Sequence, residues 1–174
     1  MATVDAEKKL QKRVLHWLVD DLGYTYLGNL EDIDNTPVKE DLLKANLKKR
    51  GYSDDQIKTA ISELLSKVNN QVDTLYQINR SVYSLLRYGR QGVKDEYGRR
   101  ETVHYIEWDA DKIDENDFYV AEEVSVLRYD RVTRKRPDVV LYINGIALGV
   151  FELKSSYVSA GLSLIHISEP TRRS

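Results

Sequence analysis

Cysteine is absent from this sequence, and histidine is scarce. Without cysteine the chain cannot form disulfide bonds, thiolate zinc sites or a cysteine nucleophile. The histidines His16, His104 and His166 share no metal-ligand spacing, so we assign them no role. Long apolar runs are also missing, because no stretch approaches the roughly 18 residues that a membrane-spanning helix needs. We therefore expect a cytoplasmic protein with no membrane partner.

The chain also lacks a large excess of charge of either sign. Its formal net charge is −2 and its pI is about 6.0, which excludes a protein that coats nucleic acid over its whole surface. Any binding to nucleic acid must therefore come from local basic clusters. The length of 174 residues fits one ordinary domain with a sizeable core.

Helical patterns occupy the first half of the chain. Thr36 and Pro37 have the residue types of an N-cap and a first helical position, and Ser53 with Gln56 has the spacing of a capping box. Apolar residues at intervals of three and four follow each of these starts. We predict helices over residues 6–22, 37–50, 53–68 and about 72–88.

After residue 100 the pattern changes to one rich in Val, Ile, Tyr and Phe, which is typical of strands. We predict strands over residues 102–108, 118–128, 138–143 and 146–154. The last two are apolar at nearly every position, which favours central strands covered on both faces. We divide the chain into a helical subdomain, 1–70, a core of 71–162, and a non-native tail, 163–174; an irregular natural tail is the alternative.

The pattern PD…ExK carries the chemistry. Asp138 follows Pro137, and the run Glu152-Leu153-Lys154 begins fourteen residues after Asp138. Hydrolysis of a phosphodiester needs a divalent cation that neutralises the phosphate and activates water. Two carboxylates supply oxygen ligands for that cation, and a lysine adds a positioning charge. Asp138, Glu152 and Lys154 are therefore the candidate catalytic residues.

The turn between the last two strands decides whether these side chains meet. A two-residue loop, Asn144-Gly145, would pair Asp138 with Phe151 and point it away from Glu152. A three-residue loop that begins at Ile143 would pair Asp138 with Val150 and bring the carboxylates to one face, and glycine suits its last position. We predict the three-residue loop. The alternative is that the charged residues merely end two strands, and for an arbitrary match this is the commoner case.

Three segments resemble the R subunit of type I restriction enzymes: Asn116-Asp117-Phe118, RPDVVLYINGIAL at 136–148, and GVFELK at 149–154. The resemblance continues more loosely through 79–89 and the opening helices. It implies an α/β fold with a restriction-endonuclease-like PD-(D/E)xK core, in which helices flank a mixed sheet, and an N-terminal helical subdomain. Core residues 71–162 would then be a truncated nuclease.

The resemblance also implies a Mg²⁺ ion held by Asp138, Glu152 and the carbonyl of Leu153, with Lys154 orienting the attacking water. The chain departs from the family after Lys154, where a helix with a glutamine and a tyrosine is expected, because no glutamine occurs beyond position 91. No G-x-x-x-x-G-K-[ST] loop is present, so ATP would bind elsewhere in a full-length subunit. The implied partners are double-stranded DNA and the modification and specificity subunits.

Charged stretches flank the motif on its N-terminal side. Five cations lead into Asp138 and are candidates to bind the DNA backbone: Arg128, Arg131, Arg134, Lys135 and Arg136. A solvated loop is the alternative for this basic run. The acidic stretch 107–123 lacks the spacing of a calcium loop and is interpreted as a connector, although Glu122 or Glu123 facing the metal is an alternative.

The motif predicts, and the resemblance implies, a Mg²⁺-dependent DNA endonuclease; the resemblance further implies coupling to ATP-driven translocation in a full-length R subunit. On its own the fragment should be weakly active. The rival hypothesis is a non-catalytic interaction or DNA-docking module whose charged triad is vestigial.

Overall fold

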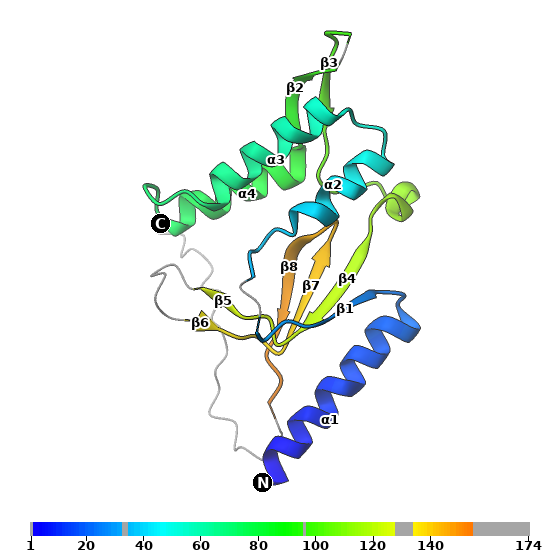
Figure 1. The fold of residues 1–174 in the computed structure, drawn as a ribbon, viewed down its shortest axis with the longest axis vertical. Coiled ribbons are helices and arrows are strands. Elements are labelled where there is room, and N and C mark those ends of the chain that lie inside the picture. Colours follow the sequence, from blue (N-terminus) through cyan, green and yellow to red (C-terminus); the bar gives the residue numbers. More distant parts are fainter. Residues whose placement is uncertain (1, 33–34, 96, 128–133, 155–174) are drawn as a thin grey trace, which may run out of the picture.

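A mixed four-stranded sheet runs through the centre of the structure (Figure 1). The structure is a computed structural model that describes residues 2–32, 35–95, 97–127 and 134–154. The strand order is β1 (Thr25–Asn29), β4 (Phe118–Glu122), β7 (Val139–Ile143) and β8 (Ile146–Phe151). The first strand is parallel to β4, and the other pairs are antiparallel. The predicted mixed α/β architecture is confirmed, whereas strand β1 was not expected.

The position of β8 corrects the expectation that both final strands are central. In this sheet β8 is the edge strand next to β7. Its outer residues are partly open to solvent, with Val150 60% exposed. The apolar run suggested a strand buried on both faces, but β8 pairs with only one strand, β7. Two of its side chains line a cavity described below.

Helix α1 (Ala2–His16) and the π-helical turn η1 (Trp17–Asp21) cover one face of the sheet. Leu18 of η1 is buried against Val120 of β4 and Val139 of β7. Because these two strand residues alternate with Ala121 and Val140, the latter belong to the opposite face. There they pack with Leu27 and Leu30 of the chain in and after β1. The helix predicted over 6–22 is confirmed in this pair of elements.

Three further helices and a small hairpin pack at the other end of the sheet, as Figure 1 shows. They are α2 (Glu40–Lys49), α3 (Asp54–Val68), α4 (Leu75–Tyr88), β2 (Arg90–Lys94) and β3 (Arg100–Val103). Their apolar sides share one core that also contains Ile146 at the start of β8. This core anchors the turn end of the β7–β8 hairpin.

The helix starts test the capping predictions. Ser53 and Gln56 form the predicted capping box of α3, and Thr74 with Gln77 forms a second one for α4. The predicted start of α2 is wrong, because the helix begins at Glu40 rather than Pro37. The chain before it pairs with the hairpin instead: the main-chain nitrogen of Lys39 donates to the carbonyl of Gly145 at 2.7 Å.

The strands are shorter than their patterns suggested. The segment 104–108 is not a strand, and the predicted strand 118–128 is interrupted after Glu122 because Glu123 has a φ of 51°. The interruption leads into β5 (Val126–Leu127), which pairs with β6 (Arg134–Lys135). The division of the chain at residue 70 stays a prediction. Among the described residues, no helix is long and apolar enough to cross a membrane.

Candidate active site at the ends of the central strands

The turn of the β7–β8 hairpin differs from the prediction. Ile143 pairs with Ile146, so only Asn144 and Gly145 form the loop. Their φ angles of 52° and 83° are those of a type I′ turn, which matches the right-handed twist of the strands better than the predicted three-residue loop. Val150 pairs with Val140, so the predicted pairing of Asp138 with Val150 is wrong.

A β-bulge at Leu148 nevertheless brings the two carboxylates to one face. Tyr142 pairs with Ala147 and Leu141 with Gly149, which leaves Leu148 as an extra residue on β8. Without this bulge, the two-residue turn would have paired Asp138 with Phe151. With it, Val139 pairs with Phe151, and the same register continued by one residue sets Asp138 opposite Glu152.

A direct contact joins the ends of the two strands. The main-chain nitrogen of Leu153 donates a hydrogen bond to Oδ2 of Asp138 at 2.5 Å. Asp138 is half-buried, whereas Glu152 and Lys154 are exposed just beyond the last pair of β8. The aspartate of the PD pair is therefore hydrogen-bonded to the main chain of the ExK run. The side chains of Glu152 and Lys154 remain open to a ligand from solvent.

Two more carboxylates lie beside this point, at the end of β4. Gln11 of α1 donates from Nε2 to Glu122 at 3.0 Å, to Glu123 at 3.4 Å and to the carbonyl of Asp138 at 3.3 Å. Tyr26 of β1 donates to the second oxygen of Glu122 at 2.5 Å. Desolvation by burial, together with this hydrogen bond and the negative charge of Glu122, raises the pKa of Tyr26 to about 12.

Glu122 is held on the helical side of the sheet. It pairs with Val139, which faces α1, so its carboxylate and that of Asp138 start from opposite faces. Among the described residues, no group of three or more acidic or histidine side chains is arranged to hold a metal ion. On the face of Asp138, the register of the hairpin places Glu152 opposite it, and the Leu153 amide is bonded to it.

The basic run before Asp138 is only partly described. Arg128 and Arg131 lie outside the described residues, while Arg134 and Lys135 are exposed on β6. Arg136 forms ion pairs with Glu123, at 3.0 Å, and with Glu31. A phosphate at Arg136 would therefore compete with two carboxylates, whereas Lys135 projects from an exposed strand position.

A cavity of about 510 Å³ lies on the sheet face to which Asp138 and Glu152 belong. Val140 and Val150 of the hairpin line it together with Pro137, the neighbour of Asp138. Asn70 and Gln71, between α3 and α4, also line it. The strand ends thus open beside a hollow large enough for part of an extended ligand.

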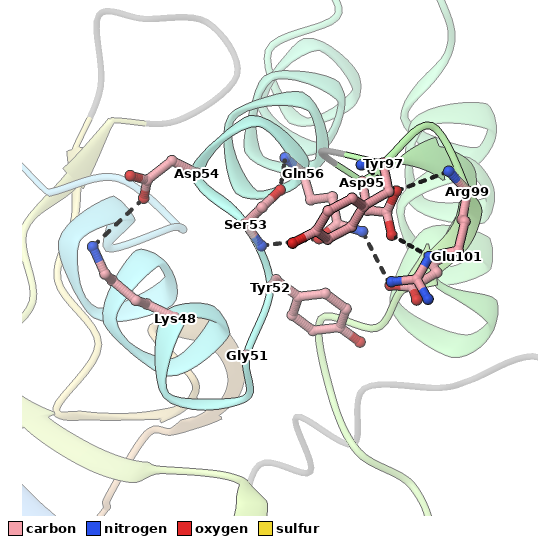
Figure 2. A pocket seen from close by; sticks show the side chains of 10 residues that line it. All are labelled: Lys48, Gly51, Tyr52, Ser53, Asp54, Gln56, Asp95, Tyr97, Arg99 and Glu101. Atoms are coloured by element: carbon pink, nitrogen blue, oxygen red, sulfur yellow. Dashed lines mark hydrogen bonds and ion pairs between the residues drawn. The ribbon is translucent and has the colours of Figure 1, made fainter.

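A second cavity, of about 480 Å³, lies between the α2–α3 connection and the β2–β3 hairpin (Figure 2). It contains none of the candidate site residues predicted from the sequence. Its charged groups have partners within the cavity: Arg99 binds Asp95 at 2.7 Å, Lys48 binds Asp54 at 3.6 Å, and Glu101 accepts from Gln56 at 3.2 Å. The Gln56–Glu101 hydrogen bond joins the hairpin to the start of α3, and the Arg99–Asp95 pair stabilises the hairpin loop, so these contacts have a structural role.

Sequence reasoning missed Gln11 and Tyr26. Neither residue type marks a site, and their roles depend on α1 and β1 lying against the end of β4.

The acidic stretch was interpreted as an exposed connector, and η2 (Ala110–Glu115) has no buried residue. Its far end is different, because Glu122 and Glu123 are half-buried. Their pattern of adjacent acids after an apolar strand was the available signal.

Comparisons with known proteins cover most of the chain. Residues 6–166 match the family described as type I restriction enzyme R protein N terminus. A stretch of 68 residues is 40% identical to a putative type I restriction enzyme MjaIXP endonuclease subunit from Methanocaldococcus jannaschii. That alignment covers 37% of this chain and 6% of the relative, so the chain matches a small part of that protein's length. No solved structure matches the chain.

Proposed function

The chain belongs to the family of type I restriction enzyme R protein N termini, and from this premise we propose that it is the DNA-cleaving part of such a protein. The proposed reaction is Mg²⁺-dependent hydrolysis of phosphodiester bonds in double-stranded DNA. The observation that carries the proposal is the hydrogen bond from Leu153 to Asp138, which joins the two halves of the PD…ExK pattern at the strand ends.

The fold is compatible with a PD-(D/E)xK nuclease core. The antiparallel β7–β8 hairpin carries Asp138 before its first strand and Glu152 after its second, so both lie at one end of the mixed sheet. Helix α1 covers one face of that sheet. We therefore assign the chain to this class of nucleases as part of the proposal.

The residues at the strand ends fit a magnesium ion. Mg²⁺ prefers oxygen ligands and is usually bound by one or two carboxylates while it keeps several waters. Asp138 accepts the Leu153 hydrogen bond with Oδ2, and within the described residues its Oδ1 accepts no other one. Asp138, Glu152 and the carbonyl of Leu153 would hold the ion. When bound, it supplies the positive charge that neutralises the phosphate and activates water.

Each side chain then has a defined task. Asp138 is fixed by the Leu153 amide, so its carboxylate is oriented before DNA arrives. Glu152 is exposed and its carboxylate would bind the ion, and the exposed ammonium of Lys154 would orient the attacking water. Arg131, Arg134, Lys135 and Arg136 would bind the DNA backbone, with Arg136 leaving its carboxylate partners to do so.

A complete R protein with its modification and specificity subunits provides the test. We expect Glu152→Gln to abolish cleavage of a supercoiled plasmid in the presence of Mg²⁺ and ATP while ATP hydrolysis by the same complex continues. Lys44→Gln, on the exposed surface of α2, is the control and should cut normally. Cleavage by the Glu152→Gln complex at the parent rate would support the rival hypothesis of a docking module with a vestigial site.

Coupling to ATP is part of the same proposal and requires segments beyond this sequence. No phosphate-binding G-x-x-x-x-G-K-[ST] loop occurs in the 174 residues, so the motor would belong to the rest of a longer protein. The 6% coverage of the relative's length is consistent with such a protein. We expect the chain alone to cut poorly.

A further inference from the structure

Helix α4 presents an exposed face on which tyrosine and arginine alternate. Tyr76, Arg80, Tyr83 and Arg87 follow each other at intervals of four, three and four residues, which places them in one row along the helix. Tyr76 is 73% and Tyr83 is 63% exposed, and both arginines are exposed as well. We call these four residues the α4 row.

The opposite side of the helix packs into the protein, whereas the side chains of the row lie on its surface. Ile78, Leu85 and Leu86 are buried, and the two leucines belong to the core shared with α2 and α3. A solvated helix face in this chain would normally mix both signs, because 28 of the 174 residues are acidic. Residues 74–94 contain no acidic residue but include Arg80, Arg87, Arg90 and Lys94.

Neither arginine of the row forms an ion pair with a carboxylate among the residues that the structure describes. Arg87 lies over the ring of Trp108 at 5.5 Å, and Trp108 is fixed by a hydrogen bond of 2.8 Å from its Nε1 to the carbonyl of Leu86. The ring orients the guanidinium without neutralising it, so Arg87 remains able to bind an anion.

We propose that the α4 row binds the phosphodiester backbone of duplex DNA and guides it to the strand ends of the candidate active site. Arginine and tyrosine are both common donors to phosphate oxygens. Seven residues of helix separate the two arginines by about 10 Å, so they can contact different phosphates. This inference rests on the proposed nuclease function for the identity of the ligand.

The cavity beside the active site links the row to the strand ends. Gln71, three residues before the cap of α4 at Thr74, lines the same cavity as Pro137. The N-terminal end of the row therefore begins close to the cavity wall, and the helix continues for 14 residues, or about 20 Å. A duplex that contacts the row has its backbone led toward Asp138.

The test measures duplex binding by the full 174-residue chain in metal-free buffer over a series of salt concentrations. Arg80→Ala/Arg87→Ala should weaken binding to duplexes of unrelated sequence alike. The negative slope of log affinity against log salt should become less steep by roughly 0.9 for each phosphate that the variant no longer neutralises. Arg80→Lys/Arg87→Lys should restore most of the affinity. Lys44→Ala/Lys58→Ala, which removes two exposed cations from α2 and α3, is the matched control and should keep the parent slope.

Three outcomes would overturn the proposal. They are a parent chain that binds no duplex at the lowest salt concentration, an arginine double variant with the parent slope, and a lysine control whose slope flattens as much as that of the arginine double variant. An unchanged slope would leave the row as a surface for a protein partner, since tyrosine and arginine are also enriched in protein interfaces. Asp138→Ala separates this result from the nuclease proposal, because it should abolish cleavage in the complete R protein without reducing metal-free binding.

Discussion

Leu153 and Asp138 are joined by a hydrogen bond of 2.5 Å that connects the residue after Glu152 with the residue before β7. The bond crosses from the end of the edge strand β8 to the start of β7, where strand pairing has already stopped. This hydrogen bond therefore holds the two strands together beyond their last main-chain pair, at the point where a nuclease would need its carboxylates fixed. Asp138 has a structural role in addition to the catalytic one that we propose.

Two substitutions at Asp138 separate these roles. Asp138→Asn retains an oxygen that accepts the hydrogen bond, so the free energy of unfolding should fall by less than about 1 kcal/mol, whereas Asp138→Ala should cost about 1–3 kcal/mol. Urea denaturation of the chain measures both values. Cleavage by the complete R protein should be lost with either variant. Equal destabilisation by the two variants would show that the Leu153 hydrogen bond does not contribute to stability.

Asn144 should be the most sensitive position of the hairpin. It is fully buried, donates to the carbonyl of Tyr105 at 2.8 Å, and accepts from the main-chain nitrogen of Asp117 at 2.7 Å. Asn144→Ala loses these bonds and also strains a φ of 52°, so we expect a loss of about 3 kcal/mol or more.

Asn144→Gly isolates the strain, because it loses the same bonds but tolerates the positive φ. It should be about 1 kcal/mol more stable than Asn144→Ala in urea denaturation. Thr59→Ala, at an exposed position of α3, serves as the control. If alanine and glycine at position 144 gave equal stability, the left-handed turn would be excluded.

Tyr26 gives the structure a measurable dependence on high pH. Burial and the carboxylate of Glu122 raise its pKa from 10.0 to about 12. A group whose pKa is higher in the folded state contributes stability that is complete below its unfolded pKa and is lost as the pH rises through its folded pKa. The free energy of unfolding of the parent should therefore fall more steeply between pH 10 and pH 12 than that of Tyr26→Phe.

The comparison is made by urea denaturation at several pH values. Parallel curves for parent and Tyr26→Phe would mean that Tyr26 does not donate to Glu122. Tyr76→Phe makes the same substitution at an exposed tyrosine and serves as the control.

The sequence predicted elements well where a local signal decides the structure. The capping box at Ser53 and Gln56 starts α3 as expected, because both partners lie within one turn of each other. Pro37 misled the assignment of α2, since the segment before Glu40 pairs with the Gly145 turn, a contact between residues distant in sequence. The edge position of β8 was likewise decided by strand order, which no local pattern encodes.

The candidate site shows the same limit. The pattern of Asp138, Glu152 and Lys154 correctly indicated segments that meet, although the turn that was expected to join them is wrong. The bulge at Leu148 places Asp138 and Glu152 on the same face of the sheet despite the different turn. An extra residue within an apolar strand has no distinct local signal. Gln11 was invisible for another reason: its three acceptors lie more than a hundred residues away.

Gln11 supports the last prediction. Its amide is nearly buried and is the donor shared by Glu122, Glu123 and the carbonyl of Asp138. Gln11→Ala removes this donor from two half-buried carboxylates, which should lower the free energy of unfolding by about 1–3 kcal/mol. Gln11→Glu should cost more at neutral pH, because it adds a third negative charge at the end of β4.

The pH dependence distinguishes charge repulsion from loss of packing. Repulsion among the three carboxylates disappears as they become protonated, so the extra cost of Gln11→Glu over Gln11→Ala should shrink in acidic solution. Lys12→Gln makes the same change in net charge at an exposed position of α1 and should show no such recovery. A constant difference between the two Gln11 variants at all pH values would mean that the side chain does not lie between Glu122 and Glu123.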